Sequence, residues 1–204
     1  MSHPLIEADV RANLCLHDIA DDPSSIYTLP MSYLVAIIDG LQAQGIADRV
    51  RIYFDDGYAS VLEAVQTLRT RAPEIEIVLA LTLEFLGQPG RIVWSDIDPL
   101  YDAGVGIAGH GREHLHMAEL SDEQNLAQLV ASRDALARYG ADEFVFPYGS
   151  YDDRVVDLND RHQLFKVMTT IDYGWDHGQA LRPRLMATTE MTAGEVVARL
   201  ASPD

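Results

Sequence analysis

Short apolar runs alternate with longer segments of helical period along most of this chain, and this alternation constrains its fold more than any other feature. Such alternation is typical of parallel α/β architectures, in which a crossover helix joins one strand to the next. It fits an open doubly wound sheet and a closed barrel equally well. The predicted strands are Asn13–Asp18, Val50–Phe54, Ile75–Thr82, Val105–Gly109, Glu143–Phe146 and Phe165–Thr169, with Arg184–Ala187 as a weaker seventh.

The predicted helices between these strands have recognisable ends. Apolar residues from Leu34 to Leu41 form one helix face, and Gly45 follows at a position suited to a C-terminal cap. Ser121 and Gln124 form a capping box at the start of another helix. Because no repeat, low-complexity tract or linker interrupts the pattern, we expect residues 1–204 to form a single domain. Two further helices are predicted, one with Val61, Val65 and Leu68 on its apolar face and one from Thr192 to Leu200.

Charge and composition exclude several classes of protein. The 204 residues include 15 Lys and Arg against 32 Asp and Glu, for a formal net charge of −17, and 48% of them are hydrophobic. That hydrophobic content is enough to build a core. The chain has no basic cluster, so it lacks the charge that binding to nucleic acid or to an anionic membrane requires. We therefore expect neither partner, and we interpret the acidity as a solvated surface.

The N-terminal residues and the single cysteine give indications of the protein's cellular location. Met1 to Asn13 lacks the basic and apolar regions of a secretory signal, and no apolar run reaches the roughly 18 to 20 residues that span a bilayer. We expect no membrane insertion and a cytoplasmic protein, or an exported one if a leader was trimmed from it. Cys15 has no partner for an internal disulfide and is interpreted as a buried thiol. No coiled-coil heptad indicates an oligomeric state.

Chemically active side chains follow several predicted strands, at the end of a parallel sheet where functional groups gather. Each group alone has an ordinary structural explanation, as a turn, a helix cap or a buried histidine. Their combination at one edge of the sheet indicates a functional site. The groups are His17-Asp18 after the first strand, Asp55-Asp56-Gly57 after the second, His110 to His114 after the fourth and Pro147-Tyr148-Gly149 after the fifth.

Two histidines four residues apart point to a metal within this site. His110 and His114 can face one point when the chain between them makes about one helical turn, and this spacing favours His114 over His116. A carboxylate from a neighbouring strand end would complete three protein ligands and leave the open position of a catalytic metal. Because adjacent aspartates point in different directions, one of Asp55 and Asp56 can bind the metal while the other accepts a proton from water.

These residues resemble the polysaccharide deacetylase family, the NodB-homology or carbohydrate esterase family 4 enzymes. Phe54-Asp55-Asp56-Gly57 is similar to the first family motif, and the stretch from His110 to His114 is similar to the second. The stretch from Phe144 to Asp152 is similar to the third motif, in the form found in the branch that acts on poly-N-acetylglucosamine. Leu14 to Asp18 and Trp94-Ser95-Asp96 also match that branch. The resemblance implies a distorted (β/α)₇ barrel of the NodB type.

The resemblance also implies a role for individual residues. Asp56, His110 and His114 would bind one divalent metal ion, most commonly zinc, with cobalt or nickel as alternatives. Asp55 would be the general base, and the backbone N–H of Tyr148 would stabilise the oxyanion. The implied reaction is hydrolysis of the N-acetyl, or another N-acyl, group of an amino sugar in a polysaccharide or glycan precursor.

The general acid is one departure from the family pattern. No Leu-x-x-His motif, the usual source of this acid, follows Tyr151. We expect His17 to take the role, because the branch with His-Asp at the first strand end places that histidine at the site. His177 is the second choice, and His162 belongs on an exposed helix face.

Two further departures affect the loop and the base. Gly111 stands where a hydroxyl residue commonly follows the first metal histidine. Val145 stands where many members have an arginine that contacts the base. The resemblance therefore implies that Asp55 lacks a cationic neighbour, and we expect its pKa to be depressed less than in those members.

The sequence also suggests substrate contacts and leaves two alternative functions open. Pro147 and Trp175 are predicted to contact the sugar, Trp175 because aromatic faces stack on sugar rings. One alternative keeps the chemistry and changes the substrate to a small or lipid-linked N-acyl sugar. The other alternative is a catalytically impaired deacetylase-fold protein that binds carbohydrate or scaffolds polysaccharide assembly. The complete Asp-Asp-His-His set favours catalysis, because a decayed site would more readily have lost a ligand.

Overall fold

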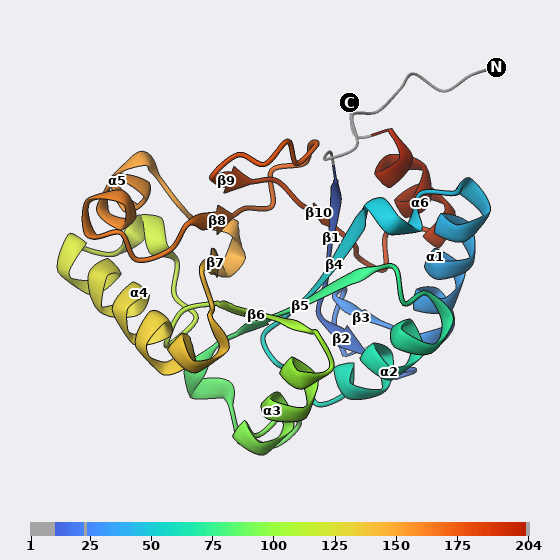
Figure 1. Ribbon diagram of the computed structural model, residues 1–204, viewed down its shortest axis with the longest axis horizontal. Helices are drawn as coiled ribbons and strands as arrows, with labels where there is room; N and C mark the ends of the chain where they lie inside the picture. The colour runs from blue at the N-terminus through green and yellow to red at the C-terminus, as the bar shows by residue number, and fades with distance from the viewer. Residues whose placement is uncertain (1–10, 23, 203–204) are drawn as a thin grey trace.

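A parallel sheet of eight strands forms the body of the molecule. The computed structural model, which describes residues 11–22 and 24–202, shows this sheet curled into an open barrel with helices on its outer face (Figure 1). The strand order is β10-β1-β4-β5-β6-β7-β8-β9, and each neighbouring pair is parallel. The strands of this sheet are β1 (Ala12–Leu16), β4 (Val50–Asp55), β5 (Glu76–Leu81), β6 (Gly106–Gly109), β7 (Glu143–Val145), β8 (Val167–Thr169), β9 (Leu181–Arg182) and β10 (Leu185–Met186).

The curled parallel sheet with outer helices confirms the predicted α/β fold class, a distorted (β/α)₇ barrel, with one short strand beyond the seven predicted. Each of the seven predicted strands is present, with ends that shift by a few residues. β9 was not predicted, because two residues are too few to show a period. Within the described residues β9 and β10 form the two edges of the sheet, so the barrel stays open between them. A separate pair joins β2 (Asp18–Ile19) to β3 (Thr28–Leu29).

The helices cover the convex face in two groups, with α1, α2 and α6 on one side of the barrel and α4 and α5 on the other (Figure 1). The predicted capping box is confirmed: Ser121 Oγ accepts a hydrogen bond from the Gln124 N–H, and Gln124 Oε1 accepts one from the Ser121 N–H. One helix, α3, was missed because it contains Pro99, whereas the polar helix expected around His162 is α5. The helices are α1 (Met31–Gln44), α2 (Val61–Arg71), α3 (Trp94–Asp102), α4 (Asp122–Leu136), α5 (Asp153–His162) and α6 (Ala193–Ala201).

Five short 3₁₀ turns connect these elements within the described residues. They are η1 (Ala47–Arg49), η2 (Leu83–Phe85), η3 (Met117–Glu119), η4 (Ala137–Tyr139) and η5 (Pro147–Gly149). The last of these follows β7 directly and contributes to the site described below.

The two faces of β4 have different chemistry. Side chains alternate along a strand, so Ile52 and Phe54 pack into the main core while Arg51, Tyr53 and Asp55 share the opposite face. On that face Tyr53 packs in a small apolar cluster with residues of β5, β6 and β7. The barrel interior is therefore partly ionic, and Asp55 lies at its carboxyl end.

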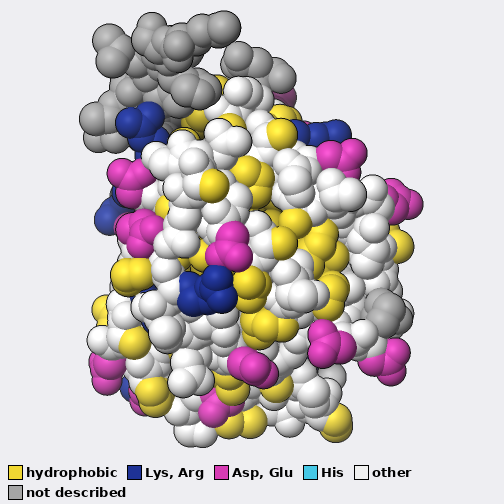
Figure 2. Space-filling model, turned by 90° about the vertical axis from the view of Figure 1, so that its right-hand side faces the viewer, with side chains coloured by type: hydrophobic (Ala, Val, Ile, Leu, Met, Phe, Trp, Pro, Cys, Tyr) yellow, Lys and Arg dark blue, Asp and Glu magenta, His cyan; other side chains and the backbone are white. Residues whose placement is uncertain are grey.

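Acidic side chains are spread over the face of the molecule that Figure 2 shows. Figure 2 shows the side of the molecule that carries α1 and α6, where Asp and Glu side chains lie apart from one another among hydrophobic and uncharged groups. This dispersion agrees with the interpretation of the acidity as a solvated surface. Among the described residues, no helix combines the length and apolar character needed to cross a membrane.

Candidate active site

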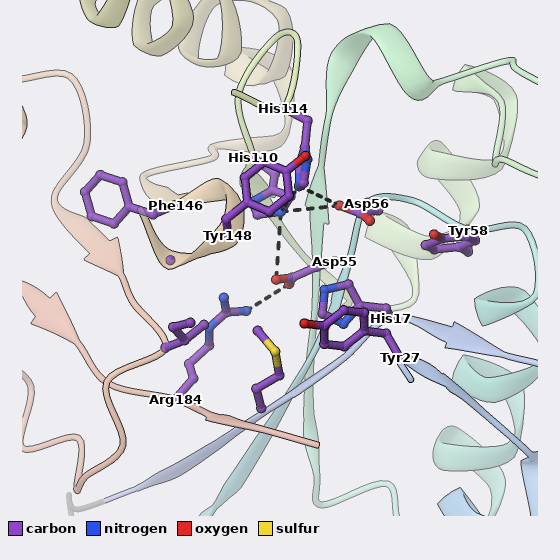
Figure 3. Close-up of a pocket in the computed structure, with 13 residues that line it drawn as sticks. His17, Tyr27, Asp55, Asp56, Tyr58, His110, His114, Phe146, Tyr148 and Arg184 are labelled. Atoms are coloured by element: carbon purple, nitrogen blue, oxygen red, sulfur yellow. Dashed lines mark hydrogen bonds and ion pairs between the residues drawn. The ribbon is translucent and has the colours of Figure 1, made fainter. Parts of the chain in front are cut away.

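The carboxyl ends of β1, β4 and β6 meet η5 around a pocket of about 220 Å³ (Figure 3). Asp55 ends β4, His17 follows β1, and His110 follows β6. Tyr148 comes from η5. The structure thus brings together the predicted base, the predicted acid, the two predicted metal histidines and the predicted oxyanion residue.

Asp56, His110 and His114 direct three potential ligand atoms to one point. Asp56 Oδ1 lies 3.0 Å from His114 Nε2 and 3.4 Å from His110 Nε2, and the two imidazole nitrogens are 3.2 Å apart. Ligand atoms held about 2.1 Å from a tetrahedral zinc ion are about 3.4 Å from one another. Asp56 Oδ1 is buried and has no hydrogen-bond partner, as expected of an atom that a cation would satisfy. These side chains therefore fit a divalent metal ion.

Hydrogen bonding orients the His110 ring, and nearby charge keeps Asp56 ionised, as metal binding requires. The Nδ1–H of His110 donates to the backbone carbonyl oxygen of Val145 at 2.8 Å, which leaves the Nε2 lone pair facing Asp56. Burial raises the pKa of Asp56, but the two imidazoles lower it more, so its carboxyl group is ionised.

The loop between the two histidines is held from α4. The Oε1 atom of Gln128 accepts hydrogen bonds from the backbone N–H groups of Arg112 at 2.8 Å and Glu113 at 3.0 Å. The chain turns at Gly111, whose φ is 79°. Gln128 thus steadies the loop where the family hydroxyl is missing.

Backbone conformations that favour glycine occur at three of the candidate site residues. The φ angles are 72° at Asp56, 57° at His114 and 59° at Tyr148, and among the described non-glycine residues only Gln163 joins them at positive φ. Such conformations cost about 1–3 kcal/mol each and persist only where the surroundings enforce them. Their concentration around the pocket supports a functional role for this region.

Asp55 has a cationic partner, contrary to the expectation drawn from Val145. Arg184 Nη1 donates to Asp55 Oδ1 at 2.8 Å, and both side chains are buried. Burial raises the pKa of Asp55, but the charges of Arg184 and His110 lower it more. The expectation was wrong because it considered only one motif position. β10 pairs with β1, which pairs with β4, so a residue from late in the chain replaces the family arginine.

Cys15 also contacts the base. The residue is buried, as predicted, and its thiol donates to Asp55 Oδ2 at 3.3 Å. The two oxygens of Asp55 are therefore fixed by different side chains. Asp55 Oδ2 is also 3.9 Å from His110 Nε2, so it faces the candidate metal position.

His17 lines the pocket next to Asp55 (Figure 3). Its ring packs against Tyr27, with 5.1 Å between ring centroids. Burial lowers the pKa of His17 and outweighs the charges of Asp55 and Asp56, which raise it. A protonated His17 would consequently give up its proton more readily than a solvated histidine.

Other candidate residues do not line the pocket. His116 is exposed and stacks on Tyr148, with 4.0 Å between ring centroids. His162, at the end of α5, and His177 are also exposed, and neither lines the pocket. Pro147 is buried and is not part of the pocket wall.

Trp175 is half-buried against the main core rather than at the pocket. The next residue, Asp176, explains its position. Asp176 pairs with Arg51 at 3.2 Å, near the amino end of β4 and four residues before Asp55. Because this contact ties the loop to the opposite end of the barrel, the structure does not bring Trp175 to the site.

Sequence reasoning missed several residues that line the pocket. Arg184 is one, and its only signal was a charge at the start of the weakest predicted strand. Tyr27 comes from the short β2–β3 region, and Ile171 and Met186 come from segments late in the chain. No local pattern distinguishes these residues from ordinary core or loop residues.

Comparison with known proteins finds a matching family profile and similar solved structures. Residues 43–167 match the sequence profile described as polysaccharide deacetylase. The fold is similar to that of the Streptococcus pyogenes deacetylase PplD in complex with acetate, with a TM-score of 0.81 and 13% identity over 94% of this chain and 98% of that chain. It is also similar to BC0361, a polysaccharide deacetylase from Bacillus cereus, with a TM-score of 0.80 and 16% identity over 94% of this chain and 69% of that chain.

At these identities the structural likeness shows the fold alone. A comparison with curated protein sequences finds no match. The profile match carries the assignment, because it covers more than half of the chain and includes the aspartate pair, both site histidines and the Pro-Tyr-Gly turn. This chain therefore belongs to the polysaccharide deacetylase family.

Proposed function

We propose that this chain is a metal-dependent deacylase that hydrolyses the N-acetyl, or another N-acyl, group of an amino sugar in a polysaccharide or glycan precursor. One observation carries the proposal: the ligand atoms of Asp56, His110 and His114 converge beside the buried carboxylate of Asp55. Family membership supplies the class of reaction. The donor set supports metal dependence.

One carboxylate oxygen and two imidazole nitrogens suit zinc, with cobalt or nickel as alternatives. Three protein ligands leave a position open for the reacting groups. A divalent ion held there would supply Lewis-acid polarisation of the acyl carbonyl and activation of water.

Asp55 is the proposed general base. Its carboxylate is ionised, and Arg184 and Cys15 fix its two oxygens in place. Oδ2 faces His110, so Asp55 can accept a proton from a water that attacks the acyl carbon at this point.

The oxyanion and the leaving amine need separate partners. The backbone N–H of Tyr148 is the proposed donor to the oxyanion, at a turn whose φ of 59° the fold enforces. His17 is the proposed general acid, which would protonate the amine nitrogen as the C–N bond breaks. Its position in the pocket next to Asp55 supports this role.

The pocket suggests how the substrate would enter. Its volume of about 220 Å³ lies below the roughly 300–1,000 Å³ of pockets that enclose drug-sized ligands. Phe146, Ile171 and Met186 provide an apolar part of the wall, suited to an acyl methyl group. Tyr148 is 53% exposed, and its ring could stack on a sugar at the rim. We infer that the N-acyl end enters the pocket while the sugar stays outside.

Metal analysis combined with acetate release tests this function. Wild-type protein reconstituted with zinc should hold about one tightly bound ion, the number that a single three-ligand site predicts. It should release acetate from oligomers of N-acetylglucosamine. Asp55→Asn should keep this ion while turnover falls by about 10²- to 10⁴-fold, the usual contribution of a general base. Asp56→Asn should lose the ion.

The exposed His162 provides a matched control, because His162→Ala removes an imidazole without touching the pocket. This variant should keep both metal and turnover. Loss of the ion in Asp55→Asn together with its retention in Asp56→Asn would reverse the two roles. If the wild-type chain binds no divalent ion, the proposed metal-dependent mechanism is wrong. If it binds the ion but hydrolyses no N-acyl sugar, a carbohydrate-binding role is favoured.

A further inference from the structure

A second cluster of metal-binding atoms lies on the β1 side of Asp55. Cys15 Sγ is 3.3 Å from Asp55 Oδ2 and 3.9 Å from His17 Nδ1, and ligand atoms of these three residues all lie within 4.8 Å of one another. A tetrahedral zinc ion with one sulfur ligand at about 2.3 Å and oxygen or nitrogen ligands at about 2.1 Å holds these atoms roughly 3.4 to 3.6 Å apart. The observed separations are close to these values.

Strand pairing builds this cluster. Cys15 and His17 are two residues apart in an extended segment, so their side chains point to the same face. β1 pairs in parallel register with β4 up to Leu16 opposite Phe54, which brings His17 next to Asp55. Two of the three ligands therefore lie on paired neighbouring strands, and the third, His17, directly follows β1.

We propose that Cys15, His17 and Asp55 form a second metal site, which binds a thiolate-preferring divalent ion such as zinc and thereby inhibits the enzyme. Cysteine sulfur selects such ions over magnesium or calcium. On binding, the thiol proton now donated to Asp55 would pass to solvent. The resulting thiolate and the carboxylate would offset the two charges of the ion, and the Arg184 guanidinium would leave one positive charge in excess.

Inhibition follows from the identity of the ligands. An ion on this site would occupy Asp55, the proposed base, and His17, the proposed acid, at the same time. This consequence rests on the proposed function, whereas the binding itself does not. The site is distinct from Asp56, His110 and His114, none of which contributes an atom to it.

The neighbouring charges and the burial of Cys15 indicate that this second site binds metal only after the site of Asp56, His110 and His114 is occupied. The Arg184 guanidinium, 2.8 Å from Asp55 Oδ1, places a positive charge beside the ion and weakens its binding. Cys15 is completely buried, so an ion must pass through the pocket beside His17 to reach it. Occupation, and with it inhibition, is therefore expected only when metal exceeds the amount that fills the first site.

Cobalt titration tests the binding directly. A thiolate bound to Co²⁺ produces a charge-transfer absorption in the near ultraviolet, and Cys15 is the only cysteine of the chain. In the wild type this band should grow after the first equivalent of cobalt has bound. Cys15→Ser should lose the band and keep the first equivalent, and Cys15→Ala serves as a second variant if serine prevents folding.

Two further variants separate the sites. His114→Ala should lose the first equivalent but keep the thiolate band. His17→Ala should lower the cobalt affinity measured from the thiolate band. The loss should exceed about 10- to 100-fold, the usual effect of removing a residue that only supports a metal ligand. Absence of the band in wild type at several equivalents of cobalt would overturn the proposal.

Inhibition is measured as the ratio of turnover with excess zinc to turnover with one equivalent. The ratio should fall well below one in the wild type and stay near one in Cys15→Ser, whatever the basal turnover of that variant. Equal ratios in the two proteins would refute the inhibitory role. A thiolate band in a wild-type protein that hydrolyses no substrate would instead count against the proposed function and leave the second site standing.

Discussion

Arg184 is completely buried, and three groups hold its side chain. Its Nε–H donates to the backbone oxygen of Thr170 at 3.0 Å, and Nη1 donates to Asp55 at 2.8 Å. Its guanidinium carbon lies 4.9 Å from the centre of the Tyr53 ring, within the range of a cation–π interaction. A buried charge pair of this kind is tolerated only while both members are present.

Arg184→Met should therefore lower the free energy of unfolding by about 3–5 kcal/mol, because it leaves the Asp55 carboxylate buried without its cation. Urea denaturation measures this change. Adding Asp55→Asn to Arg184→Met should restore part of the stability without restoring turnover.

A surface ion pair provides the control for this measurement. Arg112 pairs with Glu84, and both side chains are about half exposed. Arg112→Met should cost no more than about 1 kcal/mol. Similar losses in Arg112→Met and Arg184→Met would contradict the assignment of Arg184 as the essential partner of Asp55.

At the scale of the elements, α4 connects the predicted helix cap to the proposed metal site. Its first turn is closed by Ser121 and Gln124, and two turns beyond the cap Gln128 reaches the loop between His110 and His114. Gln128 is 3% exposed and also donates to the Glu113 carboxylate at 2.6 Å. The position of α4 thus controls how the two histidines approach each other.

Gln128→Leu should lower zinc affinity by about 10- to 100-fold, the usual effect of removing an outer-shell partner. The physical reason is that two backbone N–H groups lose their acceptor and the loop is free to shift. A competition assay with a chromophoric chelator measures the affinity. Unchanged affinity would show that Gln128 has no part in positioning the histidines.

Ser121→Ala is the matched control within the same helix. It removes the cap, and it should lower the free energy of unfolding by about 1 kcal/mol. Zinc affinity should remain at the wild-type value, since Ser121 does not contact the loop. An equal loss of affinity in both variants would attribute the effect to helix stability rather than to Gln128.

At the scale of the whole molecule, ion pairs cross the open side of the barrel. Asp176 pairs with Arg51 of β4 at 3.2 Å and with Arg182 of β9 at 2.8 Å, and Arg182 pairs with Glu143 of β7 at 2.6 Å. These side chains are at most 13% exposed. They join strands on both sides of the gap between β9 and β10, where the described sheet has its two edges.

Asp176→Asn should lower the free energy of unfolding by about 3–5 kcal/mol, because Arg51 and Arg182 lose a shared buried counter-charge. Thermal and urea denaturation measure this loss. Zinc stoichiometry should not change, since the network lies at the end of the barrel opposite the pocket.

The exposed pair between Asp142 and Lys166 provides the comparison. Asp142→Asn should change stability by no more than about 1 kcal/mol. If Asp176→Asn behaved in the same way, the network would not be needed to hold the open barrel together.

Many features of this protein depend on residues close together in the chain, and these were predictable. The strand runs, the cap at Ser121 and the cap at Gly45 follow from contacts within a few residues. The pairing of His110 with His114 is local as well, because four residues separate them. The family motifs added the choice of a barrel, which periodicity alone did not decide.

The partners of Asp55 could not be predicted in this way. Arg184 is 129 positions away from Asp55, and Cys15 is 40 positions away. Their contacts depend on the order of strands in the sheet, which places β10 beside β1 and β1 beside β4. A periodic pattern states which face of a segment is buried, but it carries no information about which segment lies opposite. The sequence by itself therefore determined the fold class and the candidate ligand set, whereas the tertiary structure decided the environment of the base.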